Sequence, residues 1–272
     1  MALRSNRFRI TIQGEEADGS IRLTDLLDQL NAVKATLNHV DAAVSGQKNP
    51  NLYYRVTNIT MNSPATFEVE AVPTQRSTPA HSRKVVAKFS RDLKTVIDGK
   101  RPKDANLELL ESYGAMAQPM RKYIAQVSIQ FDDAPAVDVP RNLGLKVDEI
   151  LGPDQVEIGT LVGSLDVIDV HNQRNLFKVY PAVGPSSVKC QFPKDMLRAA
   201  VDGINRFVRI TGELHFKKAE KYPHFMKVSK IEVLPERSDA SPLSSLRGIA
   251  SGALRGMSSS EYVDKVRNDG WS

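Results

Sequence analysis

The amino-acid sequence predicts an α+β protein with an N-terminal α+β domain, a five-stranded β-barrel and a flexible C-terminal tail. Residues 1–152 mix the two-residue alternation of strands with the three- and four-residue spacing of amphipathic helices. Residues 153–235 repeat the strand pattern around a single helix, and residues 236–272 lose both patterns. A chain of 272 residues is long enough for two hydrophobic cores of ordinary size.

Apolar periodicity defines the elements of the first domain. Residues 8–12 alternate apolar and polar side chains, as a half-buried strand does, and residues 23–44 place apolar side chains on one face of a long helix. We expect Thr24 to cap this helix, Gly46 to end it and Asp104 to cap the third helix. The remaining elements are expected in chain order as a strand pair at 53–61 and 65–72, helices at 85–97 and 107–117, strands at 124–131 and 136–139, and a helix at 143–151.

The second domain is predicted as three strands, a helix and two strands. The strands are expected at 156–170, 176–180, 187–192, 208–216 and 225–234, with the helix at 194–204. This order resembles the OB-fold over Val156 to Leu234. Gly163 and Gly212 suit tightly coiled barrel strands, because a missing side chain lets the backbone bend sharply.

Sequence signatures of catalysis are absent. The chain has no Gly-x-Ser-x-Gly elbow, no phosphate-binding loop, no His-Glu-x-x-His and no Cys-x-x-Cys. Asp166, Asp169 and His171 come nearest to a metal cluster, but alternation along a strand turns Asp166 to the opposite face. We therefore expect a non-enzymatic protein without cofactor or metal.

The single cysteine and three of the histidines are predicted to have structural rather than catalytic or metal-binding roles. Cys190 lies in an alternating strand pattern and is expected to be a buried hydrophobic residue rather than a nucleophile. His39, His81 and His215 have no partner at ligand spacing, and we expect surface or rim positions for them. Lys and Arg number 37 against 32 Asp and Glu, a net charge of +5 that is compatible with nucleic-acid contact.

Targeting and membrane signals are not found. No apolar run approaches the roughly 20 residues that a membrane-spanning helix needs. The amino terminus is rich in arginine and no apolar segment follows it. We expect an unprocessed cytoplasmic protein that does not contact a membrane.

The OB-fold resemblance implies a face that binds single-stranded nucleic acid. In such barrels the second and third strands and the loops after strands one and four contact the ligand. Outward-facing side chains here would form a basic patch that holds two tyrosines, although a solvated lysine-rich hairpin explains the same residues. The candidate nucleic-acid-binding residues are Lys178, Tyr180, Lys189, Lys217, Lys218, Lys221 and Tyr222.

The last thirty residues carry apolar side chains in an otherwise small and polar segment. Residues 236–242 have the composition of a flexible linker, and Ser258 and Glu261 have the spacing of a capping box. A helix this short is marginal by itself, so we predict that the segment folds on a partner. Its candidate partner-binding residues are Leu243, Leu246, Arg247, Ile249, Leu254, Arg255, Tyr262, Val263, Val266 and Trp271.

Three short stretches, Leu246–Ala250, Ser259–Val263 and Arg267–Trp271, resemble the toxin-binding tails of type II antitoxins, particularly those paired with PIN-domain ribonucleases. The resemblance implies that the tail wraps a small toxin, with Arg247 or Arg255 approaching an acidic, metal-binding catalytic pocket. Typical antitoxins place a small DNA-binding domain before the tail, whereas an α+β domain and a barrel precede it here, so autorepression is not implied. The alternative is a tail that folds back on its own domains.

Two binding functions therefore emerge, with an enzyme as a third class that no motif supports. The leading hypothesis is an antitoxin-like inhibitor whose tail binds and occludes a PIN-type ribonuclease toxin. The alternative is an OB-fold protein that binds single-stranded nucleic acid. These readings differ in their response to salt, because phosphate binding weakens steeply as salt rises.

Overall fold

The computed structural model describes residues 5–47, 49–60, 63–121, 123–132, 134–171, 174–184, 187–218, 220–235 and 257–269. The chain divides into two compact units. The first comprises Met1–Gln155 and Phe216–Lys221, and the second comprises Val156–His215 and Tyr222–Ser272. Helices and strands occur in both units, so the α+β class is confirmed.

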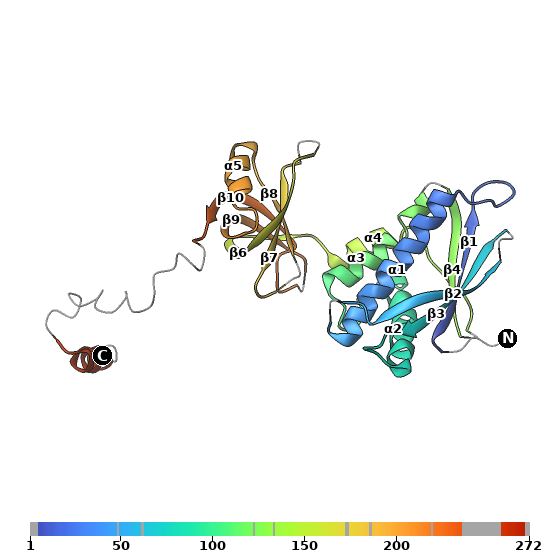
Figure 1. Ribbon diagram of the computed structural model, residues 1–272, viewed down its shortest axis with the longest axis horizontal. Helices are drawn as coiled ribbons and strands as arrows, with labels where there is room; N and C mark the ends of the chain where they lie inside the picture. The colour runs from blue at the N-terminus through green and yellow to red at the C-terminus, as the bar shows by residue number, and fades with distance from the viewer. Residues whose placement is uncertain are drawn as a thin grey trace. The chain divides into compact units, whose positions relative to one another are not determined.

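The first unit contains an antiparallel sheet and a group of helices that lie on one face of it (Figure 1). The strand order is β2-β3-β1-β4-β5. The strands are β1 (Arg7–Gly14), β2 (Leu52–Thr60), β3 (Ala65–Pro73), β4 (Ile124–Phe131) and β5 (Val137–Asp138). The helices are α1 (Leu23–Ser45), α2 (Pro79–Ile97), α3 (Leu107–Ala115) and α4 (Leu143–Leu151), with a short 3-10 turn η1 (Pro119–Arg121).

Burial in this unit follows the predicted periodicities. Phe8, Ile10 and Ile12 of β1 are buried, whereas the residues between them are only half-buried. The ring of Phe89 on α2 packs edge-on against Phe8 of β1 and Phe131 of β4, with centroids 6.2 and 5.4 Å apart. These aromatic contacts join α2 to two adjacent strands of the sheet and stabilise the core.

The opposite face of the sheet is polar and its charges are paired. Arg55 and Arg7 approach the Glu70 carboxylate at 2.7 and 3.3 Å, and Arg9 approaches Glu68 at 2.7 Å. The hydrogen bond from Arg55, together with the charges of both arginines, holds the pKa of Glu70 below its usual value. The cations of this face are therefore largely neutralised within the sheet.

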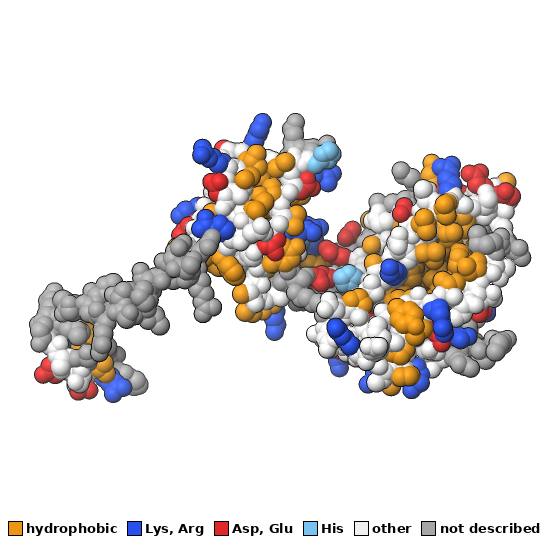
Figure 2. Space-filling model, in the orientation of Figure 1, with side chains coloured by type: hydrophobic (Ala, Val, Ile, Leu, Met, Phe, Trp, Pro, Cys, Tyr) orange, Lys and Arg blue, Asp and Glu red, His pale blue; other side chains and the backbone are white. Residues whose placement is uncertain are grey.

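An apolar edge of the sheet extends beyond the helices. Figure 2 shows hydrophobic side chains gathered on the visible face of this unit over α1 and β2. Val56 and Ile59 of the edge strand β2 are about half exposed, although their partners Val69 and Phe67 on β3 are buried. The hydrophobic side of β2 is therefore only partly covered.

Two predicted helix caps are wrong. Arg22, not Thr24, is the N-cap of α1, and it makes no side-chain capping bond. Asn106, not Asp104, caps α3, because its Oδ1 accepts a 3.0 Å hydrogen bond from the Leu109 backbone N–H. Asn106 directly precedes the first helical residue, the position from which a short side chain reaches that amide.

His81 occupies a buried hydrogen-bond cluster instead of the predicted surface position. It lies in the first turn of α2, and its Nε2 is 2.6 Å from Oδ1 of Asp41 on α1. Asp41 is completely buried, and its Oδ2 accepts the backbone N–H groups of Asn51 and Leu52 at 2.6 and 3.0 Å. One carboxylate therefore joins α1, α2 and the start of β2.

The second unit is built on a five-stranded sheet that closes in the order β10-β8-β7-β6-β9 (Figure 1). Adjacent strands are antiparallel in the pairs β6–β7, β7–β8 and β9–β10, whereas β8 and β10 pair in parallel. Its strands are β6 (Gln155–Asp169), β7 (Leu176–Pro181), β8 (Val188–Gln191), β9 (Arg206–Phe216) and β10 (Phe225–Val233). The 3-10 turn η3 (Lys194–Met196) and the helix α5 (Leu197–Asp202) separate β8 from β9.

The interior of the barrel is filled by alternate residues of its strands. Phe177 and Val179 of β7 meet Cys190 and Val188 of β8 in register, and all four are buried. Burial raises the pKa of the Cys190 thiol to about 12. Cys190 is therefore the buried hydrophobic residue that its sequence pattern predicts.

Close strand contacts explain the two barrel glycines. A Cβ atom on Gly212 would lie 2.0 Å from the Lys227 carbonyl oxygen, and one on Gly163 would lie 2.6 Å from the Tyr180 carbonyl oxygen. Gly212 sits where the β9–β10 register shifts between Val228 and Lys230. Both positions therefore require glycine because another strand approaches the backbone, rather than for backbone bending alone.

The helix α6 (Ser259–Asp269) begins with the predicted capping box. The Ser258 backbone N–H donates to Glu261 Oε2 at 2.7 Å, and the Glu261 N–H donates to Ser258 Oγ at 3.3 Å. The side chains of Tyr262 and Val263 are 43% and 44% exposed. Among the described residues, no helix combines the length and apolar character that crossing a membrane demands.

Candidate nucleic-acid interface

One row of in-register residues crosses the outer surface of the barrel. Val167 of β6 pairs with Lys178 of β7, which pairs with Lys189 of β8, and Lys189 pairs with Phe225 of β10. Phe225 in turn pairs with His215 of β9. The residues next to Lys178 and Lys189 along β7 and β8 are buried in the barrel interior, and side chains alternate along a strand. The five side chains of the row therefore share the outer face of the barrel.

The two lysines of this row form a like-charge pair. Lys178 and Lys189 are directly opposite each other on adjacent antiparallel strands, an arrangement that is unfavourable without counter-charge. In the described part of the chain, no carboxylate oxygen lies within 4.0 Å of either ammonium group. The pair is therefore poised to bind an anion.

Aromatic rings flank the lysine pair. The Phe225 ring meets the His215 ring edge-on, with centroids 5.3 Å apart and planes at 70°. Tyr180 lies two residues after Lys178 and so points to the same face of β7. Phe225 and His215 were not among the predicted nucleic-acid-binding residues, because their place beside Lys189 depends on the parallel pairing of β8 and β10.

The loop between β9 and β10 divides the remaining predicted residues. The Tyr222 ring lies against Gly184, which follows β7: a Cβ added to Gly184 would be 2.9 Å from Cδ1 of Tyr222. Tyr222 is nevertheless 46% exposed. Lys217 instead pairs with the Asp154 carboxylate at 2.8 Å. Lys218 uses its backbone N–H to bond the Leu151 carbonyl at 3.3 Å. Among the predicted residues of this loop, Lys218, Lys221 and Tyr222 are exposed, whereas Lys217 is half-buried.

The polar residues in the last part of β6 and just after it are engaged locally. Ser164 donates a hydrogen bond to Asp166, and Asp169 accepts the backbone N–H of His171 at 2.9 Å. The residues that the structure describes contain no group of three or more His, Cys, Asp or Glu side chains arranged to hold a metal ion. These carboxylates serve turn geometry.

Most predicted partner-binding residues fall outside the described part of the chain. They are Leu243, Leu246, Arg247, Ile249, Leu254, Arg255 and Trp271. Val266 belongs to α6, but its side chain is not described, which leaves Tyr262 and Val263 as the described members.

Comparisons with protein-family models, with curated proteins and with solved structures find no match to this chain.

Proposed function

We propose that the barrel binds single-stranded nucleic acid on the outer face of β7, β8 and β10. The observation that carries this proposal is the unneutralised Lys178–Lys189 pair with Phe225 beside it in the same row. The strand order supports an OB-like barrel, because a helix separates the third and fourth strands and the third and fifth strands pair in parallel. OB barrels bind oligonucleotides on their second and third strands, which here are β7 and β8.

The chemistry of the face matches the two parts of a nucleotide. Ammonium groups attract the phosphates without regard to base sequence, and binding releases counterions from the strand. Flat aromatic side chains stack on bases, and each such contact contributes about 1–3 kcal/mol. The arrangement therefore predicts salt-sensitive binding with weak base selectivity and requires no catalytic group.

Removing the lysine pair is expected to lower the affinity for single-stranded DNA and to reduce the dependence of that affinity on salt. The Lys178→Gln/Lys189→Gln variant should bind labelled oligo(dT) about 10- to 100-fold more weakly at low salt, because two phosphate contacts are lost. The plot of log Kobs against log salt concentration should become shallower by about 1.4, at roughly 0.7 per phosphate contact. Fluorescence anisotropy over a salt series measures both quantities.

A matched control removes two exposed cations that lie outside β7, β8 and β10, in the Lys194→Gln/Arg198→Gln variant. Phe225→Leu gives a second readout, because it keeps much of the apolar volume but loses the ring. This variant should bind more weakly with an unchanged salt slope. Equal affinity and slope for the lysine-pair variant and the control would refute the barrel proposal.

We also propose that the C-terminal tail binds a protein, with a PIN-type ribonuclease toxin as the partner. The specific observation is α6, whose capping box is formed while Tyr262 and Val263 remain exposed on adjacent positions. An amphipathic helix with exposed apolar side chains suits a groove on another protein. This proposal and the barrel proposal concern different parts of the chain and are compatible.

Loss of the tail is expected to abolish toxin binding. A chain that ends at Pro242 should no longer capture or inhibit a ribonuclease that the full chain captures, and Tyr262→Ser/Val263→Ser should weaken inhibition at least tenfold. Inhibition by the full chain should change little between low and high salt, because aliphatic contacts are only weakly screened. The control is Asp264→Ala/Lys265→Ala on the same helix. Ribonuclease inhibition that survives truncation would exclude the tail as the binding segment.

A further inference from the structure

The exposed face of α2 carries an excess of positive charge. Asp92 is the single acidic residue of this helix, and it is 2% exposed and paired with Lys88 at 2.8 Å. Arg83, Lys84, Arg91 and Lys94 are exposed. Arg91 comes no nearer than 3.8 Å to Asp92, and among described residues the other three have no carboxylate within 4.0 Å. This face contrasts with the open face of the sheet, whose arginines are paired.

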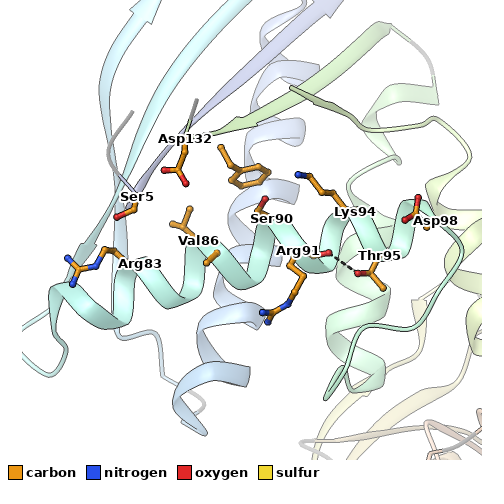
Figure 3. A pocket seen from close by; sticks show the side chains of 11 residues that line it. Ser5, Arg83, Val86, Ser90, Arg91, Lys94, Thr95, Asp98 and Asp132 are labelled. Atoms are coloured by element: carbon orange, nitrogen blue, oxygen red, sulfur yellow. Dashed lines mark hydrogen bonds between the residues drawn. The ribbon is translucent and has the colours of Figure 1, made fainter. Parts of the chain in front are cut away.

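A hollow of about 580 Å³ lies along this helix, between α2 and the end of β4 (Figure 3). Its floor is apolar, because Val86 and Phe131 are both nearly fully buried. The small residues Ala87 and Ser90 also line it, so an extended ligand can approach the helix backbone there.

The cations are distributed along the length of the hollow. Figure 3 shows Ser90 and Lys94 on the side of α2 that faces the Asp132 end of β4, whereas the guanidinium groups of Arg83 and Arg91 extend away from it. Arg83 and Lys94 are eleven positions apart, about 16 Å along a helix. Charges spread over this length fit a row of anions better than a single compact anion.

Two carboxylates restrict what the hollow accepts. Asp98 and Asp132 also line it, so its charged side chains are three cations and two anions. A small anion enclosed between them would meet repulsion from Asp132. An extended strand can contact Arg83, Arg91 and Lys94 on the solvent side and avoid both carboxylates.

We infer that this face of α2 binds the phosphate backbone of a nucleic-acid strand, which gives the first unit a nucleic-acid contact of its own. This inference rests on the proposed function, because the α2 face and the outer face of the barrel would both bind a nucleic-acid strand. Arg83, Arg91 and Lys94 place three positive charges on exposed positions of one helix, against a single buried carboxylate of that helix. Phosphates of a bound strand supply the negative charge that this helix lacks.

The test compares three variants of the full-length chain by anisotropy with labelled forty-nucleotide oligo(dT) over a salt series. The α2 variant is Arg83→Gln/Arg91→Gln/Lys94→Gln, and the barrel variant is Lys178→Gln/Lys189→Gln. The control is Lys34→Gln/Arg76→Gln/Lys103→Gln, which removes the same charge from exposed positions elsewhere in the first unit. We expect the α2 variant to lose at least tenfold in affinity and about 2 from the salt slope, at roughly 0.7 for each of three contacts.

The outcomes separate the inference from the proposed function. If only the α2 variant loses affinity for oligo(dT), the α2 inference is supported and the barrel proposal is refuted. If only the barrel variant loses affinity, the α2 inference is overturned. An α2 variant that matches the control in affinity and slope also overturns it. Because substitution can disturb folding, unchanged circular dichroism and an unchanged urea midpoint are required of each variant.

A crosslinking readout locates the contact without removing charge. Ala87→Cys places a thiol in the hollow, and a benzophenone maleimide on it should crosslink the labelled strand under ultraviolet light. Cys190 is buried and does not compete for the reagent. Lys34→Cys with the same label should not crosslink, and equal crosslinking from both positions would contradict the assignment to α2.

Discussion

Replacing Asp41 with alanine is expected to lower the free energy of unfolding of the first unit by about 3–5 kcal/mol. The fully buried carboxylate accepts two backbone N–H groups and lies 2.6 Å from Nε2 of His81. Alanine leaves the amides of Asn51 and Leu52 without their acceptor in a place where water does not reach. An unsatisfied buried donor costs about 1–3 kcal/mol, and here two are created together with a lost histidine contact.

Urea denaturation of the full chain, followed by circular dichroism, measures this loss. Asp28→Ala is the matched control, since it removes an exposed carboxylate from the same helix and should change stability by less than about 0.5 kcal/mol. Asp41→Asn should fall between the two, because the amide oxygen can still accept both backbone N–H groups, whereas the amide nitrogen replaces the oxygen that faces His81 Nε2 and the negative charge is lost. A loss from Asp41→Ala within 1 kcal/mol of the Asp28→Ala value would mean that this cluster does not hold the three elements together.

Gly212→Ala is expected to destabilise the second unit by about 3 kcal/mol or more. The added Cβ would lie 2.0 Å from the Lys227 carbonyl oxygen, which belongs to the strand backbone and cannot rotate away as a side chain can. The β9–β10 pairing must therefore separate locally. Since Phe225 lies two positions before Lys227 on β10 and pairs with Lys189 of β8, we also expect weaker oligo(dT) binding.

The control for this substitution is Gly159→Ala in β6. An added Cβ there would meet Leu214 Cδ1 at 2.7 Å, the far end of a flexible side chain that can change rotamer. We expect a cost of about 1 kcal/mol or less from Gly159→Ala. Similar urea midpoints for the two variants would show that the β9–β10 contact tolerates a side chain, contrary to the geometry.

Periodicity carried most of the fold prediction, because helices and half-buried strands impose repeats that a sequence displays directly. The strand β1, the helix α1 and the five barrel strands lie within a few residues of their expected positions. The capping box at Ser258 and Glu261 was predictable for the same reason, since its partners are three residues apart. The caps of α1 and α3 were misplaced, because more than one polar residue stands near each helix start.

The candidate site was predictable only in part. Lys178 and Lys189 follow from alternation on neighbouring strands, whereas Phe225 and His215 join them through pairings between strands that are distant in the chain. The sequence predicts Lys217 as an unpaired lysine of a loop. In the structure it pairs with Asp154, which lies sixty-three positions earlier in the sequence. The basic face of α2 could not be predicted, because only the tertiary structure shows that Asp92 is buried and pairs most closely with Lys88, which leaves Arg83, Lys84 and Lys94 without an ion pair among the described residues.

By itself, the sequence determined the class of the fold, the order of its elements and the polarity of each strand face, since these depend on neighbours a few residues apart. The tertiary structure alone decided that Asp41 meets His81, that β8 lies beside β10, and that Gly212 faces a carbonyl group. Each of these contacts joins residues that are ten or more positions apart. Their geometry arises only when the chain closes its sheets and packs its helices, so no local pattern records it.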